Sequence, residues 1–393
     1  MDTGSNNVEN VNLLKKSIKE LSNNYVTNDY VFEVKIRSKK ILCQNMKMTN
    51  LEFDSSTNGE ASICIIEFMC NVGIKYEDIC SKSDFGEAKI GVNIEVSAGY
   101  SNNFGSHTSK FFEGFIFSIS MEIVNGVTFL KIYSMDGRMW MMPNKNIILK
   151  RDKQKYSDIL KTVTSNYSSK FSDIKIDIKN EPQESVIEIY QRNESDLEFI
   201  RKIANKISLL SYVNVGSLNL VSIEFKSGEI NVEPCDAIKR VKFVSNICGI
   251  PKSVSIMSLD DKDFRKANTT NVELSNKVGE GETADNLTTN ISSLHVLNFV
   301  DNSVESDEHV KFLAESELIK RSMSLANCEI ETTFLPEIQL GTRVIVKKFG
   351  YPVDNKYILT HLNHRYSVDL SNDKRGVNYF GTKMGLQSDA FSI

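Results

Sequence analysis

The sequence predicts a β-rich α+β protein in which an inserted α-β-β-α unit separates two β-rich regions, with helices at the periphery. Apolar and polar residues alternate through residues 29–142, which is typical of strands with one buried and one wet face. Helical spacing replaces this alternation near residue 156, and alternation returns after residue 217. The length of 393 residues predicts two or three domains, and 40% hydrophobic with 25% charged residues is the balance of an ordinary globular protein.

The charge balance argues against binding to duplex nucleic acid, which needs a concentrated basic face. The chain has 47 Lys and Arg against 51 Asp and Glu, a net charge of −4. Lys347-Lys348 and Lys374-Arg375 are small basic spots, more readily interpreted as solvated strand ends than as a nucleic-acid stripe. No stretch approaches the roughly 20 apolar residues of a membrane span, and the first residues lack a signal peptide's features. We therefore expect synthesis and folding in the cytoplasm without membrane anchoring.

Residues 1–28 are predicted to form an N-terminal extension containing an amphipathic helix over residues 8–22. Its apolar positions at helical spacing are Val8, Val11, Leu14, Ile18 and Leu21. We expect this helix to dock on its own subunit or on a neighbouring one.

Residues 29–144 are predicted to form the first β-rich domain. Phe32, Val34 and Ile36 alternate with charged residues, and a second alternation runs from Ala88 to Val96. These patterns predict strands, and closing them into a small barrel would remove their exposed edges.

The same region contains the strongest local signal in the chain. Asn125-Gly126, two residues that tolerate positive φ, separate the β-prone runs Phe115–Val124 and Val127–Tyr133. This pattern predicts a β-hairpin. Trp140 and the Met residues around it are interpreted as core or as subunit interface.

Residues 145–216 are predicted to form the inserted α-β-β-α domain. Helical spacing marks Tyr156, Ile159, Leu160, Val163 and Tyr167, and short strands are expected at 174–178 and 186–189. The second helix begins at Ser195-Asp196-Leu197-Glu198. This is an S-x-x-E capping box, in which the Ser hydroxyl and the Glu carboxylate satisfy free amides of the first turn.

Residues 217–393 are predicted to form the second β-rich domain. The expected strands are Leu218–Phe225, Val241–Ile247, Val254–Leu259, Arg343–Lys347 and Tyr357–Tyr366. Residues 260–293 are polar and predict a long surface loop. A helix is expected near 307–326, and the last dozen residues are polar and interrupted by glycine.

Histidines and cysteines provide no metal-site pattern. His361 and His364 lie three apart on a predicted strand and therefore point to opposite faces, so we interpret them as structural. The seven Cys residues include no C-x-x-C pair, so reduced and mostly packed thiols are expected.

The other candidate sites are also better explained as surface features. Asp260, Asp261 and Asp263 lack calcium-loop spacing and predict a solvated turn. Gly279 and Gly281 alternate with Glu residues, which do not suit a phosphate-binding loop. No G-x-S-x-G elbow occurs, and paired carboxylates that meet only in space are not visible in a sequence. We expect no catalytic, metal-binding or cofactor-binding residues.

One segment resembles a known family. In the stretch from Glu188 to Val213, the matching positions are Tyr190, Glu194, Ser195, Asp196, Phe199 and Ile203. It resembles a segment of the phage late-control D proteins and of the N-terminal part of the type VI secretion VgrG spike proteins. The sequence departs from that family at the end of the predicted helix, where Ala204-Asn205-Lys206 replaces acidic residues.

Further matches follow in the family's order. Gly114 lies in a Phe-x-Gly-x-Ile strand motif, and Gly341, Tyr357 and His364 match the ending of the family pattern. The ordered matches cover about residues 30–370.

The resemblance implies a baseplate hub of a contractile tail, with two small, tube-like β-barrel domains. It implies a homotrimeric ring whose six barrels adapt the sixfold tail tube to the threefold spike. The implied partners are the spike, tail tube, baseplate wedge and tape-measure proteins, with nucleic acid at most passing through the lumen. The chain stops soon after the second predicted barrel, so it resembles a stand-alone hub made in the bacterial cytoplasm. The particle would be a phage tail, a tail-like bacteriocin or a contractile injection system.

Two other functions stay open at this point. One is a tail hub that degrades peptidoglycan, which needs carboxylates or a Cys–His pair that meet in space. The other is a receptor- or glycan-binding tail-tip protein, which predicts exposed aromatic clusters on loops.

Overall fold

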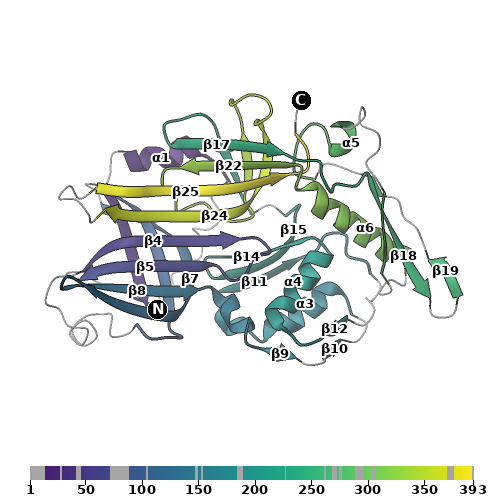
Figure 1. Cartoon of the computed structure of the whole chain (residues 1–393), viewed down its shortest axis with the longest axis horizontal. Coiled ribbons are helices and arrows are strands. Elements are labelled where there is room, and N and C mark those ends of the chain that lie inside the picture. The colour runs from purple at the N-terminus through teal and green to yellow at the C-terminus, as the bar shows by residue number, and fades with distance from the viewer. Residues whose placement is uncertain are drawn as a thin grey trace, which may run out of the picture.

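The computed structural model describes most of the chain. The described residues are 14–26, 29–40, 46–70, 88–102, 105–146, 149–151, 154–183, 189–225, 227–260, 263–267, 272–273, 277–287, 296–301, 306–369 and 376–391. Figure 1 shows a broad sheet at one side of the molecule, with the N-terminal helix beside it and the other helices gathered at the opposite side.

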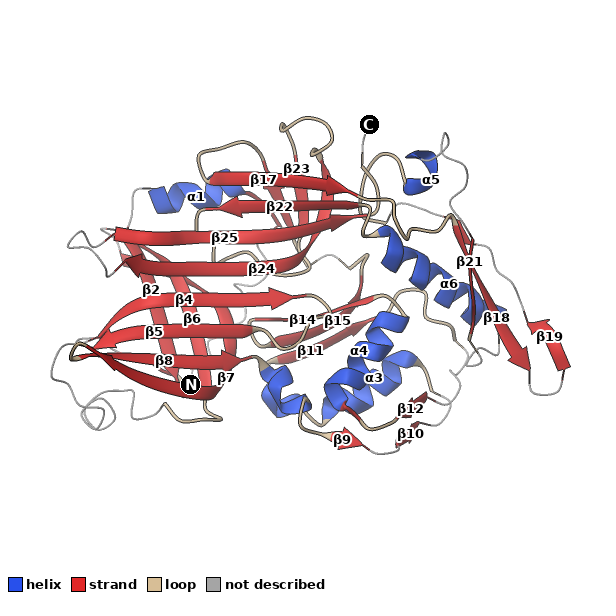
Figure 2. Cartoon of the chain, in the orientation of Figure 1, coloured by secondary structure: helices blue, strands red, loops and turns tan. Residues whose placement is uncertain are grey.

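Strands dominate the secondary structure (Figure 2). The strands are β1 (Leu14–Ser17), β2 (Asp29–Ile36), β3 (Lys39–Lys40), β4 (Met46–Ser56), β5 (Ile63–Cys70), β6 (Asn93–Asn102), β7 (Gly105–Val124), β8 (Val127–Met135), β9 (Lys145–Asn146), β10 (Leu149–Arg151), β11 (Asp173–Asp177), β12 (Ile189–Gln191), β13 (Glu194–Ser195), β14 (Leu209–Asn214), β15 (Ser217–Ser222), β16 (Glu229–Val232), β17 (Ile238–Ser245), β18 (Ser253–Asp260), β19 (Asp263–Ala267), β20 (Val272–Glu273), β21 (Val296–Val300), β22 (Ala326–Thr332), β23 (Arg343–Val346), β24 (Asn355–Asp369) and β25 (Gly376–Ser388). The helices are α1 (Ile18–Val26), α3 (Tyr156–Ser165), α4 (Asp196–Lys206), α5 (Ala284–Leu287) and α6 (Asp307–Ser322), with short 3-10 turns η2 (Gly137–Met141) and η3 (Ser168–Lys170). The prediction of a β-rich α+β fold is confirmed.

One 14-stranded sheet joins the two predicted β-rich domains. Eight of its strands run in the order β17-β22-β25-β24-β4-β5-β8-β7 across the molecule (Figure 1). The sheet forks at β24, because Asn355–Ile358 pair with β23 while His361–Ser367 pair with β4. The branches continue as β23-β16-β1 and as β7-β6-β2-β3. The two regions are therefore linked by backbone hydrogen bonds.

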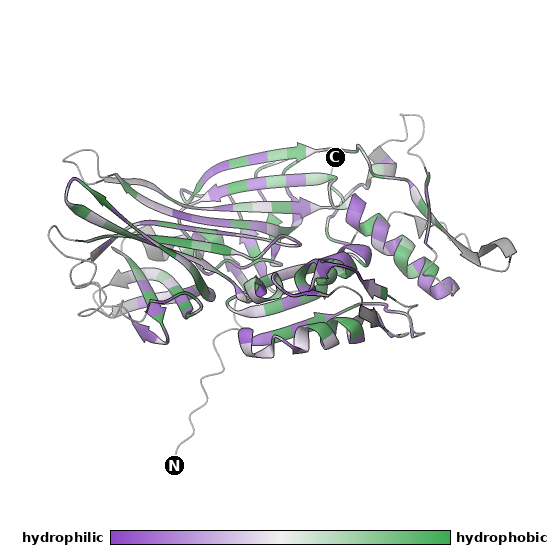
Figure 3. Ribbon diagram, turned by 60° about the horizontal axis from the view of Figure 1, so that its bottom comes forward, coloured by the Kyte–Doolittle hydropathy of each residue, from purple (hydrophilic) through white to green (hydrophobic). Residues whose placement is uncertain are grey.

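Strict alternation builds the core under this sheet. Along β8 and β22 every second residue is buried. Figure 3 shows hydrophilic and hydrophobic bands alternating along the strands of the sheet. Ile66 and Ile132 of the first region and Ile330 and Tyr357 of the second belong to one cluster of buried residues. A second cluster fills the inserted unit and the face of α6 that packs on it.

The predicted hairpin and the predicted inserted helices are confirmed. Val124 pairs with Val127 across Asn125-Gly126, whose φ angles are 51° and 80°. α4 begins with the expected capping box, with Ser195 Oγ accepting from the Glu198 amide and the Glu198 carboxylate accepting from the Ser195 amide.

The sheet of the inserted unit differs from the prediction. Its strand order is β11-β15-β14, so β15, expected in the second β-rich domain, belongs to the insert. The predicted boundary between residues 216 and 217 lies in the turn of the β14–β15 hairpin. Of the strand expected at 186–189, residues 186–188 lie outside the described part, and Ile189 begins β12, which pairs with β10.

The prediction of a helix over 8–22 is wrong in its bounds. Residues 1–13 lie outside the described part, Leu14–Ser17 form β1 parallel to β16, and the helix begins at Ile18. Ser17 and Glu20 exchange backbone-to-side-chain hydrogen bonds of 2.9 and 3.1 Å, the pattern of a capping box. That box sets the helix start ten residues later than the apolar periodicity suggested.

Three further expectations need correction. Residues 260–293 are not a loop throughout, since β19, β20 and α5 lie among their described residues. The polar end of the chain contains the long strand β25, which buries Met384 and Leu386 against β22 and β24. β6 begins at Asn93 rather than near Ala88, because Gly91 turns the chain with φ +86°.

Candidate functional site

The candidate functional site is a surface, which we call the wet face. It is the side of the eight strands from β17 to β7 that points away from the core. Its polar side chains are held in ion pairs between neighbouring strands: Arg240–Glu331 at 3.5 Å, Lys383–Glu329 at 2.8 Å, His361–Asp54 at 3.0 Å, Arg365–Glu52 at 2.5 Å and Lys131–Glu67 at 3.1 Å. The alternation of the strands places these residues here, because their sequence neighbours fill the core.

The ion pairs shift the pKa values of charged groups on the wet face. The hydrogen bond from His361 lowers the pKa of Asp54, and Lys383 lowers the pKa of Glu329 in the same way. Glu67 raises the pKa of Lys131. Positive and negative groups alternate, so this surface lacks the concentrated positive charge that retains a phosphate backbone.

A shallow hollow of about 290 Å³ lies on the wet face over β17, β22, β24 and β25. The residues that line it include Lys242, Glu329, His361, Gly385 and Gln387. It is open and has charged side chains in its lining, unlike the enclosed apolar pockets that bind small molecules.

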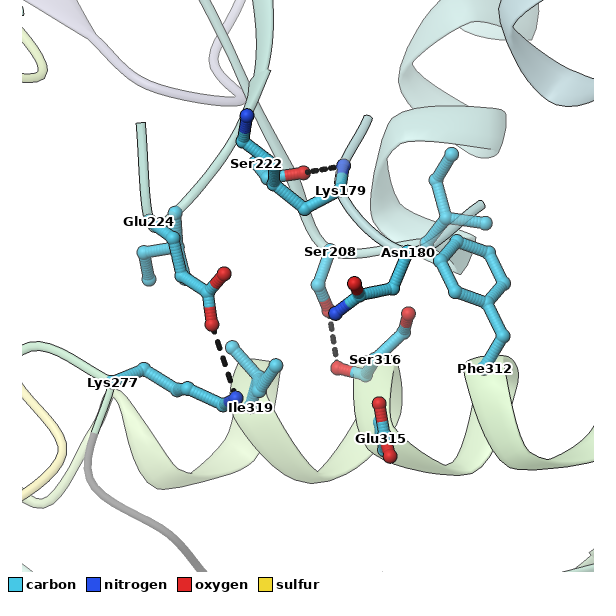
Figure 4. Close-up of a pocket in the computed structure, with 12 residues that line it drawn as sticks. Lys179, Asn180, Ser208, Ser222, Glu224, Lys277, Phe312, Glu315, Ser316 and Ile319 are labelled. Carbon is cyan, nitrogen blue, oxygen red and sulfur yellow. Dashed lines mark hydrogen bonds and ion pairs between the residues drawn. The ribbon is translucent and has the colours of Figure 1, made fainter. Parts of the chain in front are cut away.

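A second pocket, between α6 and the insert, is a packing seam (Figure 4). Its volume is about 40 Å³, far below the roughly 300 Å³ of a small-molecule site. Its polar groups bind one another: Lys277 pairs with Glu224 at 3.0 Å, and Ser222 Oγ accepts from the Lys179 amide at 2.8 Å.

The residues of the Glu188–Val213 motif gather at the start of α4. The buried Asp196 carboxylate accepts from Tyr167 Oη and Gln191 Nε2, each at 2.7 Å. Burial and this contact with Asp196 raise the pKa of Tyr167 to about 12. Asp196 thus joins the turn after α3 to β12 and α4, which is a structural role.

The other motif residues of this segment support the same junction. Glu194 pairs with Lys202 at 2.9 Å, and Tyr190 lies under the Arg192 guanidinium. Phe199 is fully buried in the core of the insert.

The two motif glycines allow close backbone approaches. A Cβ on Gly114 would overlap the carbonyl oxygen of Met135. Gly341 has φ +75°, and a Cβ there would overlap the Tyr212 hydroxyl of the insert. Gly341 is therefore the point at which the second β-rich region meets the insert.

The structure brings His364 and Tyr357 into the core. His364 Nδ1 bonds Thr382 Oγ1 at 2.8 Å among the rings of Phe53, Phe111 and Phe334, and burial lowers its pKa to about 3. Tyr357 Oη donates to the Val353 carbonyl at 2.8 Å, and burial raises its pKa.

The remaining candidate residues from the sequence do not gather at one site. His361 is on the wet face, opposite to His364, as the strand spacing predicted. In the described ranges no three His, Cys, Asp or Glu side chains gather closely enough to hold a metal ion. Asp261 lies outside those ranges, as do Lys374-Arg375, whereas Lys348 pairs with Glu233.

The loop with Gly279 and Gly281 is held by the C-terminal segment, which the sequence did not reveal. The buried Asp389 carboxylate accepts from the amides of Lys277, Val278 and Gly279 at 2.5, 3.1 and 2.7 Å. These contacts join positions more than 100 residues apart, so no local pattern marks them.

Sequence reasoning also missed a buried ion pair between Asp136 and Arg138. Their side chains are 1% and 0% exposed, and Arg138 also donates to Ser62 Oγ. The run Asp136-Gly137-Arg138 follows directly on β8 and was the available signal, since an acidic and a basic residue flank a glycine there.

Comparison with known proteins identifies the family. The family model of the Alg8 N-terminal domain matches residues 78–367, more than half of the chain. The chain belongs to the Alg8 N-terminal domain family. No curated protein matches this member of the family.

Solved structures share its fold over nearly the whole chain. A tail protein from Neisseria meningitidis superposes with a TM-score of 0.62 at 13% identity, covering 91% of this chain and 96% of that one. A 43 kDa tail protein of prophage MuSo2 from Shewanella oneidensis gives 0.60 at 12% identity, covering 93% and 100%. A component of the type VI secretion system from E. coli gives 0.54 at 9% identity, covering 91% and 77%.

These likenesses show that this member of the Alg8 N-terminal domain family has the fold of phage tail proteins. The same fold occurs in a type VI secretion component. None of the helices in the described part of the chain is both long and apolar enough to span a bilayer.

Proposed function

We propose that the chain is the structural central hub of a contractile-tail baseplate, in a phage tail, a tail-like bacteriocin or a contractile injection system. The observation that supports this most is the match to phage tail proteins along more than nine tenths of both chains. In this proposal three copies form a ring that adapts the sixfold tail tube to the threefold spike. The 29–144 region and the part of 217–393 that follows β15 act as its two wall units.

The wet face suits the wall of such a ring. Its charges are paired within the sheet, so a passing DNA or tape-measure protein would meet no surface that retains it strongly. The sheet runs through both β-rich regions without a break in hydrogen bonding, which suits a wall that must keep its shape.

The buried polar residues support a structural rather than an enzymatic role. Asp196, His364 and Asp389 are buried, and each is held by hydrogen bonds to groups from other elements. Their partners fix the packing of α4, β24 and the C-terminal segment. The proposed partners are a spike protein, the tail tube, baseplate wedge proteins and a tape-measure protein.

The stoichiometry tests the proposal. Sedimentation should give three copies of 44.4 kDa, about 133 kDa, and negative-stain images should show rings when the spike or tube protein is added. A strict monomer at micromolar concentration, with no rings in the presence of either protein, would contradict the hub function. A peptidoglycan zymogram separates the hub from a cell-wall hydrolase, since the hub should leave no cleared zone.

A further inference from the structure

Within the described residues, the run of eight strands from β17 to β7 has two open edges. Among the described residues, β17 pairs only with β22. At the opposite end, β7 pairs with β6 as far as Phe115, and Ile116 bonds the turn at Val92. Within the part of the chain that the structure describes, its last residues, 118–124, then pair on one side only, with β8. The open segments have similar lengths, eight residues in β17 and seven in β7.

The open edge of β7 exposes apolar side chains that belong to the core side of the sheet. Met121 and Ile123 face the same way as Leu130 and Thr128, their partners on β8. Leu130 is 2% exposed, whereas Met121 and Ile123 are 43% and 64% exposed. Exposed apolar residues on an open strand edge are a template for pairing with another strand.

The open edge of β17 is complementary to it. On the core side, Val241 and Phe243 are only partly buried, although their partners on β22 are fully buried. On the wet side, Arg240 and Lys242 are exposed and basic, while the wet side of the β7 edge carries Glu122. Pairing the two strands would join apolar to apolar on one side and basic to acidic on the other.

The two edges lie at the two ends of the run of eight strands from β17 to β7 (Figure 1). A contact between two different surfaces of identical chains is heterologous, and it repeats until the rotation closes a ring. We propose that the β17 edge of one copy pairs with the 118–124 edge of β7 in the next copy. The partner is a second copy of this chain, and the sheet and its core continue from copy to copy. This inference rests on the proposed hub function and specifies the surface by which its ring is built.

Two variants, each with one edge blocked, test the pairing. Met121→Lys with Ile123→Lys blocks the β7 edge by replacing its apolar core side with charges that would face Val241 and Phe243 of β17. Lys242→Glu with Val244→Glu blocks the β17 edge by opposing Glu122. Each variant alone should sediment as a 44.4 kDa monomer. An equimolar mixture should give a 1:1 dimer of about 89 kDa, because the unblocked β17 edge of the first variant can pair with the unblocked β7 edge of the second. Only a heterologous contact predicts this rescue by mixing, and the rescue also shows that both variants fold.

Val296→Lys is the matched control, because Val296 is 45% exposed on β21, away from both edges. This variant should assemble like the unaltered chain. If the edge variants still form trimers, or if the mixture contains only monomers, the edge pairing is wrong while the hub function stands on the unaltered trimer. If the unaltered chain is a monomer even with spike and tube proteins present, the hub function and the edge pairing both fail.

Discussion

Replacing Asp136 with Asn should destabilise the protein more than any surface change. The buried Asp136 carboxylate accepts from the Ser62 amide at 2.7 Å, from the Arg138 amide at 2.9 Å and from the Arg138 guanidinium at 2.8 Å. Asn keeps the shape of the side chain but removes its charge and one acceptor. Arg138, which is 0% exposed, would then be a buried charge without a counter-ion.

The expected loss is about 3–5 kcal/mol in the free energy of unfolding, the usual cost of removing one partner of a buried pair. Adding Arg138→Met should recover most of it, because the double variant buries no charge at all. Arg138 Nη1 has no hydrogen-bond partner, so apart from its bonds to Asp136 the guanidinium gives up only its bond to Ser62 Oγ. Urea unfolding followed by circular dichroism at one fixed protein concentration gives all the values needed.

Asp54→Asn is the matched control, since its pair with His361 is 52% and 40% exposed. It should change the free energy of unfolding by less than about 1 kcal/mol. The reasoning is refuted if Asp136→Asn loses no more than this control, or if the losses of the two single variants simply add in the double variant.

Three further changes probe the motif residues. Ser195→Ala removes the cap of α4 and should cost about 1 kcal/mol in urea unfolding, whereas Ser165→Ala, with its exposed hydroxyl, should cost little. Gly341→Ala should cost at least about 1 kcal/mol from its positive φ alone, and Tyr212→Phe in the same chain should relieve part of any further loss from overlap. His364 has a native pKa of about 3 and an unfolded pKa near 6.5, so the unfolded state takes up the proton first as the pH falls. The stability it contributes is complete above about pH 6.5 and should fall by about 2 kcal/mol by pH 5, a loss that His364→Gln should remove from the pH profile.

Local chemistry made several elements predictable from the sequence. Asn125-Gly126 specifies its hairpin because few other residue pairs accept two positive φ angles. Ser195 and Glu198 specify the start of α4 because their side chains satisfy its free amides. The capping box at Ser17 and Glu20 was equally visible, and reading it first would have placed α1 correctly.

Long-range pairing explains what the sequence could not reveal. β25 has a polar and glycine-containing sequence, yet it is a strand because β22 and β24 flank it on both sides. β15 looks like any buried strand, and only its pairing with β11 and β14 assigns it to the insert.

In the candidate site, too, local spacing was predictable from the sequence and long-range pairing was not. The spacing of His361 and His364 predicted that they face opposite ways, which the alternation of β24 confirms. The wet-face ion pairs, by contrast, join strands such as β4 and β24 that are some 300 residues apart in the chain. Their partners depend on sheet order and register, which alternation alone does not specify.

The fork at β24 bears directly on how such a chain could form a ring wall. Two separate barrels joined by a linker would be free to move against each other. Here β24 is hydrogen-bonded to β25 along its length and to β23 and then β4 on its other side, so both regions share one strand. The insert braces the same junction, since Asn58 and Ser211 exchange two hydrogen bonds of 2.8 Å and Tyr212 packs on Gly341. In the proposed ring, the angle between the two wall units is therefore fixed within each chain, and any error in closure must be absorbed at the open edges of β7 and β17.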